Sequence, residues 1–161
     1  MPSKLFRITS FLALGASIAP AQSLAAGALA ELAAPLEIVV ERDASRVPAA
    51  KRLARIHAEN RDWASAWRVL ERSAPHATKD AEYQGFAGTV LRQLKRSPEA
   101  VERYRAATRL APDDGRWWAG LGLALEEAGR KAEAKEAFAA AAERTDTLPP
   151  VLKKQVERRS R

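Results

Sequence analysis

Residues 118–141 read WAGLGLALEEAGRKAEAKEAFAAA, and this stretch decides the fold. Its landmarks recur 34 positions earlier in the chain. The matching pairs are Gly122 with Gly88, Leu125 with Leu91, Ala134 with Ala100, Phe138 with Tyr104, and Ala141 with Ala107. A fixed period of this length is typical of repeat architectures in which each unit is a helix pair that cannot bury its apolar face alone. The sequence therefore predicts an all-α protein built from stacked helical hairpins.

The repeated residues resemble the tetratricopeptide-repeat (TPR) pattern W-x₂-L-G-x₂-Y…A-x₃-F…P. The copy near residues 115–146 departs from it only at the Tyr, which is Leu125, and at the closing Pro, which is Asp146. The copy near 81–114 replaces the Trp by Gln84 and the Leu by Ala87. A weaker copy near 47–80 keeps Leu53, Ala54, His57, Ala66, Leu70 and Ser73. The resemblance implies a TPR domain over residues 47–161 with about three repeats.

The repeat residues have packing roles that follow from this resemblance. Glycines are expected where the two helices of a hairpin cross most closely, alanines on the facing helix, and large side chains in the seams between helices. The ten structural positions are Gly88, Leu91, Ala100, Tyr104, Trp118, Leu121, Gly122, Leu125, Ala134 and Phe138.

Helix boundaries are also predicted locally. Ser97, followed by Pro98 and Glu99, is typical of a helix N-cap, and Asp114 can cap the helix after it. Residues 148–159 are predicted to form a capping helix. One face of that helix is expected to carry Leu148, Val151, Leu152 and Val156, so that the last hairpin is covered.

A TPR array has an inner groove lined mainly by the first helix of each hairpin, which implies a protein or peptide segment as partner. Counting from the landmarks, the predicted groove residues are Lys51, Arg55, Glu82, Thr89, Arg92, Arg116, Leu123 and Glu126. This mixture favours an acidic or amphipathic segment, and it lacks the Lys/Asn set of TPRs that clamp a C-terminal carboxylate. The plainer interpretation is that most of these charges are merely solvated.

No catalytic, metal or cofactor motif is found in the sequence. There is no cysteine, no phosphate loop and no nucleophile elbow, and the two histidines, His57 and His76, lack convergent carboxylates. Glu126 and Glu127 are a pair of adjacent carboxylates, but neighbouring residues on a helix diverge by about 100° and cannot act together in catalysis. Trp117 and Trp118 could form an aromatic cage, but packing between hairpins explains them better. We expect a non-enzymatic protein without cofactors.

The first residues suggest export. Lys4 and Arg7 precede an uncharged stretch, and small residues follow at Ala19-Pro20-Ala21, which is typical of a secretory signal peptide. We assign residues 1–25 to a signal peptide or N-terminal membrane anchor and 26–46 to a linker, irregular from Leu36 to Arg46. A helix packed on the repeats is the alternative. The expected location is the periplasm or the periplasm-facing inner membrane, with the cytoplasm as alternative.

The segment Pro112-Asp113-Asp114-Gly115-Arg116-Trp117-Trp118-Ala119-Gly120-Leu121 resembles the C-terminal repeats of MSHA-type pilus biogenesis TPR proteins, as does the segment 148–159. The resemblance implies an adaptor of the bacterial envelope in type IV-like pilus or secretion-system assembly. Two alternatives remain. One is a TPR chaperone or regulator with an unrelated client. The other follows from the net charge of +7: binding of nucleic acid or an anionic surface through the basic tail, Lys153 to Arg161.

Overall fold

A computed structural model describes the backbone of residues 21–160 and the side chains from Glu31 onward. This part of the chain contains eight α-helices and no strand, so the predicted all-α fold is confirmed. The helices are α1 (Ala21–Arg42), α2 (Val47–Glu59), α3 (Trp63–Ser73), α4 (Ala81–Gln93), α5 (Ser97–Leu110), α6 (Gly115–Glu127), α7 (Lys131–Ala142) and α8 (Pro150–Arg159). The expected signal segment 1–25 lies outside the described residues except for its last five, which begin α1.

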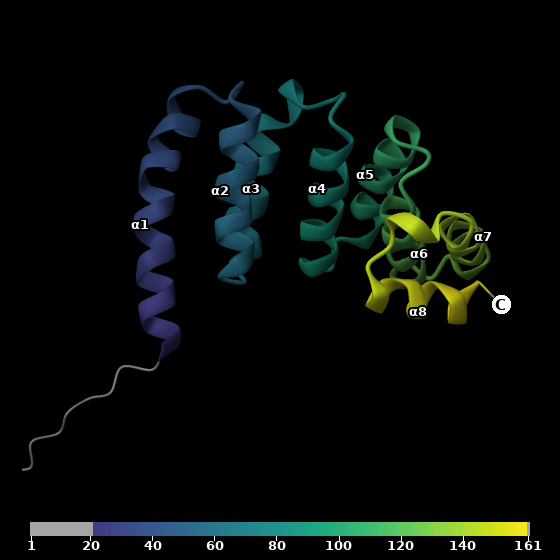
Figure 1. Cartoon of the computed structure of the whole chain (residues 1–161). Coiled ribbons are helices and arrows are strands. Elements are labelled where there is room, and N and C mark those ends of the chain that lie inside the picture. Colours follow the sequence, from purple (N-terminus) through teal and green to yellow (C-terminus); the bar gives the residue numbers. More distant parts are fainter. Residues whose placement is uncertain (1–20, 161) are drawn as a thin grey trace, which may run out of the picture.

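The helices pair as α2 with α3, α4 with α5 and α6 with α7, and the pairs stack side by side (Figure 1). Each pair turns through one residue with a left-handed backbone: Arg61 (φ 60°), Lys95 (φ 61°) and Gly129 (φ 78°). The three turns close with the same hydrogen bonds, for example from the amide of Arg96 to the carbonyl of Leu91 and from Arg130 to Leu125. The 34-residue period is therefore repeated in backbone geometry.

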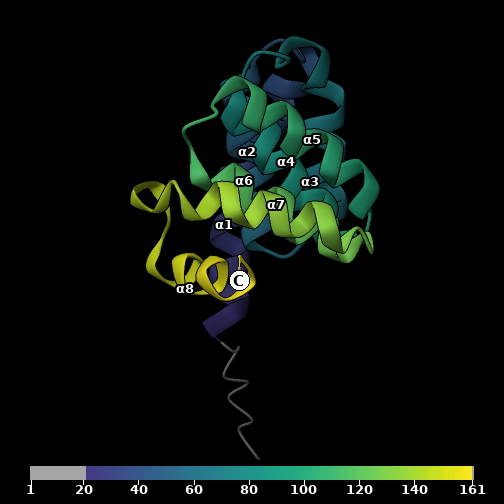
Figure 2. The same cartoon turned by 90° about the vertical axis from the view of Figure 1, so that its right-hand side faces the viewer.

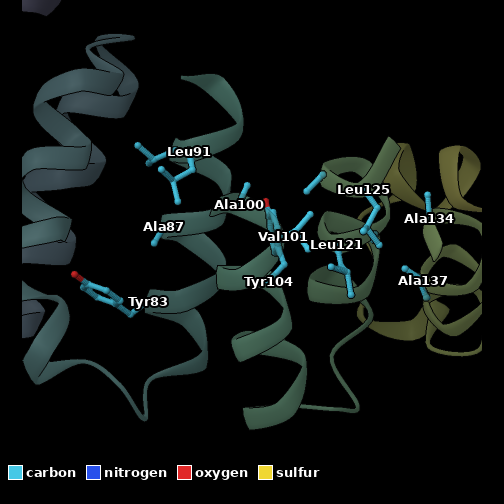
Figure 3. Close-up of a cluster of buried hydrophobic side chains, with 14 of the residues drawn as sticks. Tyr83, Ala87, Leu91, Ala100, Val101, Tyr104, Leu121, Leu125, Ala134 and Ala137 are labelled. Atoms are coloured by element: carbon cyan, nitrogen blue, oxygen red, sulfur yellow. The ribbon is translucent and has the colours of Figure 1, made fainter. Parts of the chain in front are cut away.

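Buried side chains run without interruption from one hairpin to the next (Figure 3). Leu91 of α4, Tyr104 of α5, Leu125 of α6 and Phe138 of α7 are each at most 3% exposed. Of the ten structural positions predicted from the sequence, only Trp118 is half-buried, and the other nine are buried. Because every hairpin covers its neighbour, removal of apolar surface from water stabilises the stack as a whole.

Glycines mark the closest approaches between helices. A Cβ on Gly88 would lie 2.9 Å from the Tyr104 ring, and a Cβ on Gly122 would lie 2.7 Å from the Phe138 ring. Both contacts lie within a hairpin. Gly120 has the same relation to Tyr104 of the preceding hairpin, with a separation of 2.3 Å. The ring of Tyr104 thus fills the space between two glycines on successive hairpins.

The first helix of the second and third hairpins is capped by an aspartate. Asp80 accepts a hydrogen bond from the Tyr83 amide at 2.9 Å, and Asp114 accepts one from the Arg116 amide at 3.0 Å. The predicted cap at Ser97 is wrong, because Arg96 occupies the N-cap position and no side chain caps α5. The Ser97 hydroxyl instead points to the Glu127 carboxylate, 3.4 Å away.

Helix α8 covers the last hairpin, with Leu148 and Val156 buried and Leu152 half-buried. The expectation that Val151 shares this face is wrong: its side chain is 72% exposed. The helix begins at Pro150 and not at the predicted residue 148, so Leu148 packs from the extended segment before it. Residues 152 and 156 are four apart and lie on one side of the helix, whereas residue 151 is rotated by about 100° from residue 152. Arg159 pairs with Glu126 of α6 at 3.0 Å and anchors the end of α8.

The predicted linker over residues 26–46 is corrected by α1, which continues to Arg42. Alanine favours helix, and Ala33, Leu36 and Val40 recur at helical spacing and pack against α2. Only residues 43–46 connect the two helices. Among the helices that the structure describes, none combines the length and hydrophobicity that crossing a bilayer requires.

Candidate partner-binding groove

The first helices of the hairpins, α2, α4 and α6, lie on one side of the stack, and α8 lies on that side beside α6 (Figures 1 and 2). All eight groove residues predicted from the sequence belong to these three helices. All six of their charged side chains contact other parts of the same chain. Lys51, Arg55, Glu82, Arg92, Arg116 and Glu126 each take part in an ion pair.

Three of these residues join α2 to α4. Lys51 Nζ lies 2.8 Å from a carboxylate oxygen of Asp80 and 3.0 Å from one of Glu82, and Arg55 also pairs with Glu82. The hydrogen bond from Lys51 is the main cause that lowers the pKa of the Glu82 carboxyl below its usual value. Since Glu82 is half exposed, water weakens these attractions. This end of the groove is therefore electrically balanced.

The next joint, between α4 and α6, is held by Arg92. Its guanidinium approaches the Glu127 carboxylate at 2.6 Å and 3.2 Å, a two-point contact that fixes orientation as well as charge. The Thr89 hydroxyl shares a hydrogen bond of 2.9 Å with the Tyr104 hydroxyl, and burial is the main cause that raises the pKa of Tyr104. Glu126 points elsewhere, to Arg159 of α8, so the two adjacent glutamates diverge.

A pocket of about 280 Å³ opens between α4, α6 and the start of α8. Four predicted groove residues line it, namely Thr89, Arg92, Arg116 and Leu123, together with Tyr104, Trp117, Gly120, Pro149 and Leu152. The sequence did not indicate these last five as groove residues, although the glycine leaves the space and the proline and leucine belong to the predicted cap. Lys51, Arg55, Glu82 and Glu126 do not line the pocket. Its wall contains two guanidinium groups and no carboxylate.

The aromatic residues act mainly in packing. The Trp117 ring lies where a Cβ on Gly85 of the preceding hairpin would approach it to 2.2 Å, and Arg116 stacks over the same ring at 4.8 Å. Trp118 points away from the groove: its Nε1 donates to the Pro112 carbonyl at 2.8 Å, and Arg144 covers its ring at 5.4 Å. The two tryptophans therefore do not form a cage.

Gln84 occupies the position of the repeat's Trp in the second hairpin and makes a comparable contact. Its Nε2 donates to the Ala77 carbonyl at 3.1 Å, and its amide oxygen accepts from Arg103 at 3.2 Å, so this buried amide is satisfied. His57 is half-buried and lies 3.7 Å from Glu37 and 3.8 Å from Asp62, so the expectation that it has no carboxylates nearby is wrong. Within residues 21–160, no group of three or more potential ligands is placed to hold a metal ion.

The fold is a solenoid of stacked helical hairpins. Residues 87–149 match the tetratricopeptide repeat family, so this part of the chain consists of TPR repeats. Superkiller protein 3 of Schizosaccharomyces pombe is 31% identical to it over 105 residues, which are 61% of this chain and 8% of that protein.

Two crystal structures have a similar fold. The MamA protein is similar with a TM-score of 0.66, 23% identity and coverage of 73% of this chain and 64% of that chain. The Sgt2 TPR domain from Aspergillus fumigatus is similar with a TM-score of 0.62, 19% identity and coverage of 69% and 74%. At these identities the likeness establishes the fold alone. This chain thus spans less than two thirds of Superkiller protein 3 and of MamA. TPR proteins are scaffolds that bind protein or peptide partners and are typically not enzymes.

Proposed function

We propose that this chain is a non-enzymatic adaptor that holds an acidic, amphipathic segment of a partner protein in its groove. The observation that carries this proposal is the pocket between α4, α6 and α8, whose wall is apolar at Trp117, Leu123 and Leu152 and cationic at Arg92 and Arg116. An apolar side chain fits the wall, and a neighbouring carboxylate on the same segment fits the guanidinium groups.

The exposed part of Arg116 is the preferred contact for such a carboxylate. Arg92 is only 18% exposed and is committed to Glu127, whereas the Arg116 side chain is 49% exposed and its pair with Asp114 lies on its own helix cap. In the rest of the groove, the ion pairs of Lys51 and Arg55 with Asp80 and Glu82 have a different effect. They balance charge between α2 and α4, so the preference for acidic segments rests on the exposed guanidinium donors of Arg116 at the pocket.

A pull-down from the cells that express the protein tests the proposal, with the full chain as bait. Leu123→Glu places a carboxylate in the apolar wall and is expected to release the proteins that the natural chain retains. Ala139→Glu, at an exposed site of α7, is the matched control and should retain them. Circular dichroism establishes that both variants fold. Retention of the same proteins by the Leu123→Glu variant would contradict the proposal.

We further propose that the adaptor acts in the bacterial envelope, with its repeats facing the periplasm, in the assembly of a type IV-like pilus or a secretion system. The positively charged, then uncharged start of the chain and the Trp117-Trp118-Ala119-Gly120-Leu121 segment support this proposal. A reporter that is active only in the periplasm, fused after Arg46, is expected to be active. Cytoplasmic retention would remove the export proposal, and co-purification without any assembly component would remove the pilus role.

A further inference from the structure

The two ends of the described array differ in polarity. At the C-terminal end, α8 presents Lys153, Lys154, Glu157 and Arg158 to solvent together with the exposed Val151, so its outer face is mostly polar, as a solenoid end needs. At the other end, α1 presents exposed apolar side chains. Leu32 and Ile38 are each 53% exposed, and Pro35 is exposed as well. Figure 1 shows α1 at the edge of the array, with α2 on its inner side.

The outer surface of α1 has a regular pattern. Glu31, Pro35, Ile38 and Arg42 are spaced by four, three and four residues, so they form one stripe along the helix, which we call the outer stripe. All four are exposed, and neither Glu31 nor Arg42 takes part in an ion pair within the described residues. Glu37 and Glu41 lie on another side, where they line the pocket between α1 and α3.

The outer stripe is complementary to itself in one orientation. When a second α1 lies antiparallel across it, Glu31 faces the second copy's Arg42, Ile38 faces the second copy's Pro35, and the same contacts repeat by two-fold symmetry. When the second α1 lies parallel, Glu31 faces Glu31 and Arg42 faces Arg42, and both pairs repel each other. Charge at the two ends of the stripe therefore selects the antiparallel arrangement.

We propose that α1 is a self-association surface through which two copies of this chain pair antiparallel, with Ile38 and Pro35 at the centre and Glu31–Arg42 pairs at both ends. A contact of about three helical turns is small compared with the interfaces of permanent dimers, so the pair is weak and concentration-dependent. The surface lies at the opposite end of the array from the α4–α6–α8 pocket, and the pairing therefore leaves the proposed groove open. The inference does not depend on the proposed function.

Sedimentation of the full chain over a range of concentrations tests the pairing. The Glu31→Arg and Arg42→Glu variants are each expected to weaken association about tenfold, because each turns both end contacts into repulsions. The double variant carrying both changes restores opposite charges across the two-fold axis and is expected to recover the natural association. Only pairing between copies predicts this recovery. Val151→Glu, on the exposed side of α8, is the control and should change nothing.

A cysteine experiment tests the orientation, since the chain contains no cysteine of its own. Residues 31 and 42 are about 16 Å apart along one helix and cannot form a disulfide within a chain. The variant with both Glu31→Cys and Arg42→Cys is therefore expected to form a covalent dimer under mild oxidation, whereas Glu31→Cys alone is not. A chain that stays monomeric, an association that ignores the charge reversals, or efficient cross-linking through residue 31 alone would each overturn the proposal.

Discussion

Gly129 allows the repeat geometry to be tested without disturbing any contact. Its φ is 78°, and a Cβ added there would have no atom within 4 Å, so Gly129→Ala changes only the backbone preference. The left-handed conformation costs an L-residue about 1 to 2 kcal/mol, and the loss of unfolded-state freedom returns about 0.4 to 1 kcal/mol. The expected net loss of unfolding free energy is about 1 kcal/mol. In a domain of this size that lowers Tm by about 3 °C.

The equivalent turns should respond in the opposite direction. Lys95 and Arg61 adopt the same conformation, at φ 61° and 60°, without a glycine's freedom. Lys95→Gly and Arg61→Gly are each expected to raise the unfolding free energy by about 1 kcal/mol, by the same balance of terms. Lys135→Gly, in the middle of α7, is the matched control and should lower it by about 1 kcal/mol, because a helix interior disfavours glycine.

Urea unfolding followed by tryptophan fluorescence and circular dichroism measures all four variants. The change in unfolding free energy is expected to be positive for Lys95→Gly and negative for Lys135→Gly. If Lys95→Gly destabilised the protein as much as Lys135→Gly, the left-handed turn would not be a repeated feature of the hairpins and the reasoning would fail.

Three further predictions concern packing and charge. Gly122→Ala should lower the urea midpoint, because overpacking against the Phe138 ring at 2.7 Å costs about 1 to 3 kcal/mol and exceeds the gain of about 1 kcal/mol in helix propensity. Unfolding free energy should fall as pH drops below 4.5, since the folded state lowers the pKa of Glu82 through Lys51; Glu82→Gln should reduce this slope in an acid titration of stability. Stability should also fall as pH rises above 10, because burial raises the pKa of Tyr104 and only the unfolded chain ionises freely there; Tyr104→Phe should flatten this alkaline limb, and an unchanged limb would refute the assignment.

The fold was predictable because the period is encoded in residues whose size is critical. Gly88 and Gly122 each lie against an aromatic ring, so the sequence keeps both landmarks in register. A helix packed on the repeats is only the alternative interpretation of the segment that forms α1, because the positively charged and then uncharged start of the chain favours a targeting segment followed by a linker. The spacing of Ala33, Leu36 and Val40 would have indicated a helix with one buried side.

The groove was predictable only as a set of positions. Counting along the first helices places Arg92 and Glu126 on the right elements, but the choice of ion-pair partner depends on side-chain conformations and on the neighbouring hairpin. Arg92 therefore pairs with Glu127, and Glu126 pairs with Arg159 of the cap. The pocket was not predicted for a similar reason, because two of its lining residues, Pro149 just before α8 and Leu152 within it, come from the end of the chain that folds back over the last hairpin.

Site-specific photo-cross-linking tests the central claim most directly. A photoreactive phenylalanine analogue replaces Leu123 in the pocket in one variant and Lys135 on the exposed side of α7 in another, and both full chains are irradiated in the cells that express them. The account predicts a discrete covalent adduct with a partner protein from position 123 and none from position 135. An adduct from position 135 alone would show that the partner binds the opposite face, and the groove would then not be the binding site.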